Sequence, residues 1–108
     1  MNECFYHTDD GKRLRKLRDL KPDVFKSFVE FDSKAFEAGA LDVKTKELIA
    51  VATAHLTQCP YCIDAHTKRA KKAGASDVEI AESIFVAMAM RASASWAHSA
   101  IAMKALEG

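Results

Sequence analysis

The chain has 108 residues, of which 49% are hydrophobic and 29% charged, and its formal net charge is +1. This length fits one domain with a modest core, so assembly into an oligomer is expected. The small net charge argues against nucleic acid as the main partner, because phosphate binding usually requires a basic excess. The longest mainly apolar stretch, Ile84 to Met90, is too short to cross a bilayer, so no membrane partner is expected.

The amino-terminal third is predicted to contain an arm and two helices. Residues 1–11 form the expected flexible arm. Leucines at helical spacing predict a short helix over residues 12–20. Pro22 suits the first turn of a second helix, predicted over residues 22–38, and Gly39 is expected to end it.

The middle of the chain predicts a buried helix. Asp42 has the residue type of an N-cap for a helix that runs to about Leu56. Residues 48–52 are apolar on every side of that helix, which predicts that they are buried all round.

The carboxy-terminal half also has only helical signals. Pro60 can open a third helix, which is predicted to end at Gly74. Ser76 followed by Glu79 is a capping-box pattern. The alanine-rich sequence after it predicts two helical segments, divided near residues 93–95, because one uncapped helix of that length is unusual. The predicted fold class is all-α, in a single domain over residues 1–108.

The strongest functional signal is a pair of cysteines, Cys59 and Cys62, followed by His66. On a helix, steps of ~100° per residue place these three side chains within one sector of ~60°. Two thiols at this spacing can close a disulfide or hold a metal. Because the chain has three cysteines, an odd number, a secreted disulfide framework is not expected. Redox or metal chemistry in the reducing cytoplasm is expected instead.

Geometry nominates Glu47 as the partner of His66. The helices before and after Cys59 are joined by a very short connection, so they should form an antiparallel hairpin. Glu47 lies ~13 Å from the turn along one arm and His66 ~9 Å along the other, so their side chains can meet. A relay from Glu47 through His66 to Cys62 would activate one sulfur, and Cys59 would trap the oxidised product.

The pattern Glu47-x11-Cys59-x2-Cys62-x3-His66 resembles the alkylhydroperoxidase D-like branch of the carboxymuconolactone decarboxylase family, over roughly residues 28–102. The resemblance implies an all-helical oligomer, a trimer or hexamer of helical hairpins. It also implies a thiol-dependent peroxidase in which Cys62 becomes a sulfenic acid, Cys59 donates a proton and then forms the disulfide, and Glu47 and His66 form the relay. The substrate would be a peroxide or a disulfide, and an external thiol would reduce the pair; no cofactor is expected.

Two details qualify the expected chemistry. The best-studied peroxidase of that branch has a second histidine between its cysteines, where this chain has Pro60 and Tyr61, so full peroxidase efficiency is not implied. The position of Cys59 at a helix start favours its thiolate, whereas the resemblance assigns the first oxidation to Cys62.

Three alternatives remain open at this level. The string Cys-Pro-Tyr-Cys also occurs in glutaredoxins, but that fold needs a preceding strand and a downstream proline, and the only prolines are Pro22 and Pro60. A second alternative is a zinc site made from the two cysteines, His66 and Glu47, or from a further Cys4–His7 pair. The third is a redox-sensing module that changes assembly without turnover. His55 and His98 are expected to be structural, although His98 could enter a site from a neighbouring helix or subunit.

Overall fold

The computed structural model describes His7 and residues 10–108, and this part of the chain contains helices but no strand. In chain order, the helices are α1 (Gly11–Leu20), α2 (Pro22–Phe36), α3 (Val43–Thr57), α4 (Pro60–Lys72) and α5 (Asp77–Ala105). The all-α prediction is confirmed, and a thioredoxin-like fold is wrong for this chain. Of the predicted arm, residues 1–11, the structure describes only His7, Asp10 and Gly11, and Gly11 already belongs to α1; Cys4 lies outside the described residues. None of the helices described is long and apolar enough to span a membrane.

Helix α2 ends two residues before the predicted boundary. It begins at Pro22 as expected, but Glu37 is already extended, with φ −61° and ψ 146°. Gly39 does not cap the helix; its N–H donates to the Leu41 carbonyl at 2.9 Å, inside the turn that leads to α3. The early end has a physical cause. The Lys46 ammonium donates to the Ala35 and Glu37 carbonyls, which would otherwise accept from backbone N–H groups of a further helical turn.

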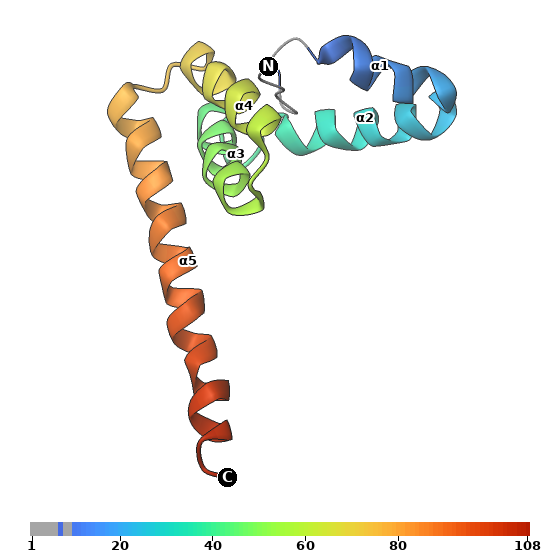
Figure 1. Ribbon diagram of the computed structural model, residues 1–108. Coiled ribbons are helices and arrows are strands. Elements are labelled where there is room, and N and C mark those ends of the chain that lie inside the picture. Colours follow the sequence, from blue (N-terminus) through green and yellow to red (C-terminus); the bar gives the residue numbers. More distant parts are fainter. Residues whose placement is uncertain (1–6, 8–9) are drawn as a thin grey trace, which may run out of the picture.

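Helices α3 and α4 form the predicted hairpin and supply the centre of the core (Figure 1). Val51 of α3 and Ala70 of α4 are both completely buried. Ala75 and Ile80 extend this apolar cluster to the start of α5. The hairpin therefore holds the candidate site residues on the best-packed part of the molecule.

A left-handed residue makes the hairpin turn. Gln58 has φ 58° and ψ 45° directly after α3. This conformation reverses the chain, and the Cys59 N–H then donates to the Ala54 carbonyl at 3.1 Å. Pro60 opens α4, as the sequence predicted.

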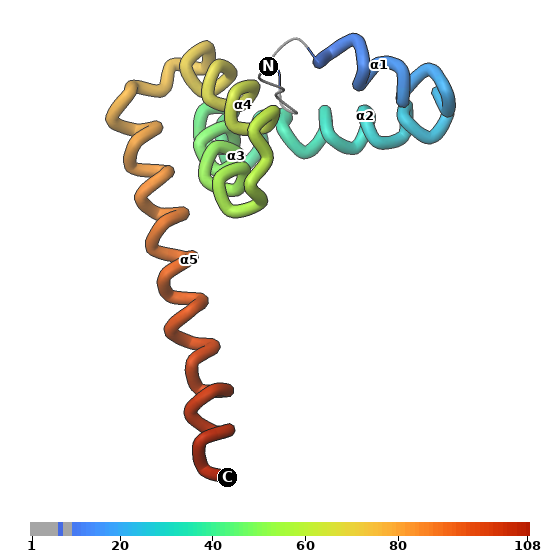
Figure 2. Tube along the Cα trace, in the orientation of Figure 1, coloured from blue at the N-terminus to red at the C-terminus, as the bar shows by residue number. Residues whose placement is uncertain are grey.

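Helix α5 is continuous, so the predicted division near residues 93–95 is wrong. The predicted capping box is confirmed at its start, where Ser76 Oγ accepts from the Glu79 N–H and Glu79 accepts from the Ser76 N–H. The serines near the expected break do not interrupt the helix, because no glycine or proline accompanies them and the surrounding alanines favour helix. Figure 2 shows α5 running well beyond the α3–α4 hairpin.

The isolated chain is extended for its size. Its radius of gyration is 18.0 Å, whereas a compact domain of this length has about 13 Å. Large apolar side chains are exposed on the outer half of α5, including Trp96 (79%) and Ile101 (71%).

Ile49 of α3 is 50% exposed, so the prediction that residues 48–52 are buried on every side is wrong for the single chain.

Candidate redox site

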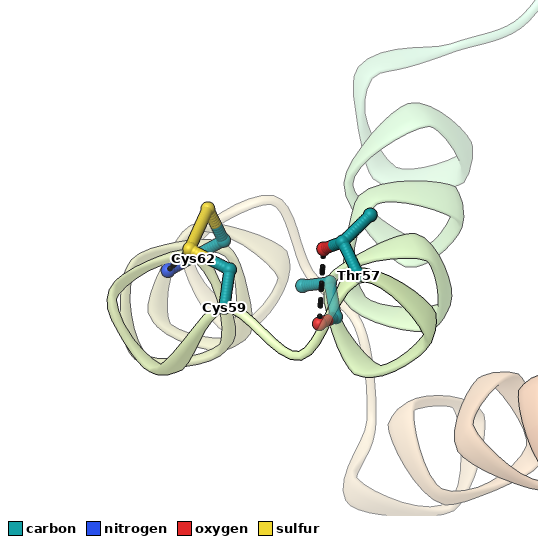
Figure 3. Close-up of a disulfide and its surroundings, with 4 residues drawn as sticks. Thr57, Cys59 and Cys62 are labelled. Atoms are coloured by element: carbon teal, nitrogen blue, oxygen red, sulfur yellow. Dashed lines mark hydrogen bonds between the residues drawn. A yellow bond between two sulfur atoms is a disulfide. The ribbon is translucent and has the colours of Figure 1, made fainter.

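The two cysteines of the motif lie at the start of α4 and are joined by a disulfide (Figure 3). Their Cα atoms are 5.3 Å apart. Cys59 is the N-cap of α4, and its sulfur accepts a hydrogen bond from the Cys62 N–H at 3.2 Å. Both residues are half-buried. The sulfur of Cys59 therefore accepts from a first-turn N–H group at the positive end of the helix, an environment that favours a thiolate after reduction.

Glu47 and His66 meet across the hairpin. Their side chains form a hydrogen bond of 2.6 Å between Nδ1 of the imidazole and Oε1 of the carboxylate. The Glu47 side chain is 6% exposed and that of His66 is 16% exposed. Because a carboxylate oxygen accepts this hydrogen bond, Nδ1–H is the donor, and Nε2 is the ring nitrogen that the contact with Glu47 leaves available.

The shape of α4 places the imidazole near the thiols. His66 lies four residues after Cys62, one turn further along the same helix face. The structure thus assembles the Glu47–His66 contact and the Cys59–Cys62 disulfide on one hairpin. The catalytic roles of these four residues stay predictions.

Two residues that the sequence analysis did not single out also bear on the imidazole, one directly and one through its neighbour. Phe36, the last residue of α2, stacks on the His66 ring, and Lys46 of α3 holds the chain around Phe36. No spacing rule relates Phe36 to His66, because the turn after α2 and all of α3 separate them. A tertiary structure was needed to find them.

The residue between the cysteines is tied to the amino-terminal segment. The Tyr61 hydroxyl donates to Oδ2 of Asp10 at 2.7 Å, and Arg13 and the His7 N–H also donate to this carboxylate. The Tyr61 hydrogen bond is the largest of the effects that lower the pKa of Asp10 below its ordinary 3.8. Tyr61 lines a cavity of about 260 Å³ together with His7, Gly11, Leu14, Pro60, Asp64 and Ala65. A residue between the two cysteines is therefore used here for a contact with the segment around α1.

The remaining histidines lie outside this arrangement. Nδ1 of His55 donates to the Val51 carbonyl at 2.7 Å within α3. His98 is exposed on the outer half of α5. Within His7 and residues 10–108, no group of three or more His, Cys, Asp or Glu side chains is arranged to hold a metal ion. The described part of the chain therefore offers no set of ligands for the zinc alternative. The further Cys4–His7 pair of that alternative includes Cys4, which lies outside the described residues.

Comparison with known proteins agrees with this architecture. An uncharacterised protein of the cox locus of Paracoccus denitrificans is 48% identical over 81 residues, which are 75% of this chain and 73% of that protein. A carboxymuconolactone decarboxylase family protein from Legionella pneumophila has a similar crystal structure, with a TM-score of 0.72, 39% identity and coverage of 76% and 73% of the two chains.

A third relative comes from Thermotoga maritima. It is a carboxymuconolactone decarboxylase family protein for which a role in the antioxidative response has been suggested. Its structure matches with a TM-score of 0.58 and 36% identity over 70% of each chain. Residues 22–105 match the Carboxymuconolactone decarboxylase family as a whole. This chain belongs to the carboxymuconolactone decarboxylase family and carries the Cys-x-x-Cys pair.

Proposed function

We propose that this protein is a thiol-dependent peroxidase and disulfide oxidoreductase that uses Cys59 and Cys62 as its redox pair. The observation that carries the proposal is the Cys59–Cys62 disulfide on the same hairpin as a part-buried Glu47–His66 hydrogen bond. A histidine whose Nδ1–H is held by a carboxylate has its other nitrogen free to take a proton from a thiol. The suggested antioxidative role of the Thermotoga maritima relative supports the same chemistry.

The proposed cycle has three steps. The Cys62 thiolate attacks the O–O bond of a hydroperoxide, which gives a Cys62 sulfenic acid and releases an alkoxide that takes up a proton as an alcohol. The Cys59 thiolate then attacks the Cys62 sulfur and displaces hydroxide, which leaves as water and closes the disulfide. An external dithiol, supplied in the cytoplasm, reduces the disulfide and is itself oxidised. His66, oriented by Glu47, receives and returns the protons.

Mass spectrometry of the reduced protein after one equivalent of peroxide tests this cycle. The expected product of the parent protein is the Cys59–Cys62 disulfide, and a Cys59→Ser variant should accumulate the sulfenic acid at Cys62. Cys62→Ser should lose dithiol-dependent peroxide consumption, whereas Cys4→Ser, the matched control, should keep it. Full activity in Cys62→Ser would remove that thiol from the proposed role. Disulfide formation without peroxide turnover, together with a change in assembly, would instead favour a redox-sensing module.

We also propose that the working form is a homo-oligomer, a trimer or hexamer. The large radius of gyration and the exposed apolar residues of the outer half of α5 support this proposal, since a single chain leaves that helix half without a packing partner. Sedimentation velocity should give a mass of several chains at micromolar concentration. Trp96→Glu should dissociate the assembly, whereas the control Glu107→Gln, at the exposed chain end, should not. A monomeric parent protein would contradict this proposal.

A further inference from the structure

The flat face of the His66 ring is covered by an aromatic side chain from another helix. The ring centroids of Phe36 and His66 are 5.1 Å apart, and the ring planes differ by 16°, so the two rings are stacked. Phe36 is half-buried in this position at the end of α2. The imidazole is therefore restrained on a face as well as at its Nδ1 edge, where Glu47 accepts its hydrogen bond.

A lysine holds the backbone on both sides of Phe36. Nζ of Lys46 donates to the Ala35 carbonyl at 3.0 Å and also to the Glu37 carbonyl. Carbonyls at the end of a helix have no partner inside the helix, so an ammonium group is a suitable donor for them. Lys46 precedes Glu47 in α3, which means that adjacent residues of one helix fix the Phe36 backbone and the imidazole edge.

The two restraints on the imidazole act on different motions. A single hydrogen bond at Nδ1 fixes the distance to Glu47 but allows the ring to twist about the N–H···O direction. Stacking against a flat ring opposes that twist, because aromatic rings in contact prefer defined relative orientations. Together the contacts define the direction of Nε2, the nitrogen left to exchange a proton.

We propose that Phe36, held by Lys46, is a positioning residue that sets the plane of His66 for proton transfer with the thiols. The inference rests on the proposed function, since it assigns that role to the imidazole. Phe36 touches neither thiol in this role; it acts through the ring that it covers. Small errors in the position of a proton-transfer group cost large factors in rate, so the loss of the stack should lower the reactivity of Cys62 at neutral pH about ten- to hundredfold.

The variants are chosen to separate the flat ring from simple bulk. Phe36→Leu keeps an apolar side chain but removes the aromatic face, whereas Phe36→Tyr keeps that face and should rescue the parent behaviour. Phe31→Leu is the matched control, because Phe31 lies on the same helix and is 72% exposed. Lys46→Met keeps the length of the side chain but removes the donor. If Lys46 acts through Phe36, the double variant that combines Phe36→Leu with Lys46→Met should be alkylated at Cys62 no more slowly than Phe36→Leu alone.

Two readouts keep this inference apart from the peroxidase proposal. The first is the NMR signal of the His66 ring protons, which the Phe36 ring current should shift upfield; the signal should move downfield in Phe36→Leu but not in Phe36→Tyr or Phe31→Leu. The second is the rate of Cys62 alkylation by iodoacetamide in reduced protein across pH. Alkylation needs the thiolate but no peroxide, so it reports how much of Cys62 is deprotonated even if the parent protein does not consume peroxide.

The expected result is slower alkylation of Phe36→Leu at neutral pH, with its pH profile displaced to higher pH, and a parent-like profile for Phe36→Tyr. An unmoved His66 signal in Phe36→Leu would show that the rings are not stacked in solution and would overturn the inference. A moved signal with an unchanged alkylation profile would overturn it as well, since the stack would then have no effect on the thiol. If the parent protein does not consume peroxide but the alkylation profiles are as expected, only the peroxidase proposal is contradicted.

Discussion

Replacing Glu47 is the most direct test of the proposed proton relay. Its side chain is 6% exposed and binds the His66 ring at 2.6 Å, so water cannot easily take its place. A hydrogen bond to a charged group contributes about 1.5–3 kcal/mol, and one between neutral groups about 0.5–1.5 kcal/mol. Glu47→Gln keeps an acceptor and removes the charge, so the difference of about 1–1.5 kcal/mol should slow Cys62 oxidation about five- to tenfold. Glu47→Leu removes both and leaves the Nδ1–H buried without a partner, which should slow oxidation about ten- to hundredfold.

The assay for this prediction is a stopped-flow measurement of Cys62 oxidation in reduced protein, with peroxide in excess and no recycling thiol. Glu82→Gln, at an exposed position of α5, is the matched control and should oxidise at the parent rate. Circular dichroism checks that each variant is folded. Folded Gln and Leu variants with unchanged rate constants would refute the relay. A Gln variant slower than the Leu variant would show that charge at this position is not what assists the imidazole.

Three further predictions concern the scaffold and its response to pH. Gln58→Gly should stabilise the fold by up to about 1 kcal/mol in urea unfolding, because φ 58° is costly for a residue with a Cβ; a loss of stability would contradict this explanation. Ser76→Ala should lower the free energy of unfolding by about 1 kcal/mol through loss of the α5 cap, and an unchanged midpoint would show that the cap is dispensable. Tyr61→Phe removes the main cause of the lowered pKa of Asp10, whose contribution to stability is present above pH 3.8 and is lost as pH falls through the lowered value. The stability gap between parent and variant should therefore be widest at neutral pH and narrow in acid, and a gap that grows in acid would reverse the assigned sign.

Much of this architecture follows from local sequence signals. Pro22, Pro60 and the Ser76–Glu79 box placed three helix starts correctly, because each acts on the backbone groups next to it. The Glu47–His66 contact could also be predicted from the sequence, since a short turn fixes which residues of the two helices face each other.

What the sequence did not predict depends on contacts between distant segments. Lys46 ends α2 early, although it belongs to another helix. Phe36 covers His66 only because the chain turns back after α2. The prediction divided α5 into two segments because a long helix without internal caps is unusual. The alanine-rich composition of α5 favours helix throughout and keeps it continuous. The exposure of Ile49 was missed because an apolar run does not say whether its cover comes from the same chain.

The candidate redox residues all come from one contiguous stretch, from Glu47 to His66, closed by the turn at Gln58. Bringing such near neighbours together costs little chain entropy, and folding that relies on local contacts is fast. Helices α1 and α5 supply none of these four residues, so a change in the surfaces of those two helices would leave the candidate redox residues in place.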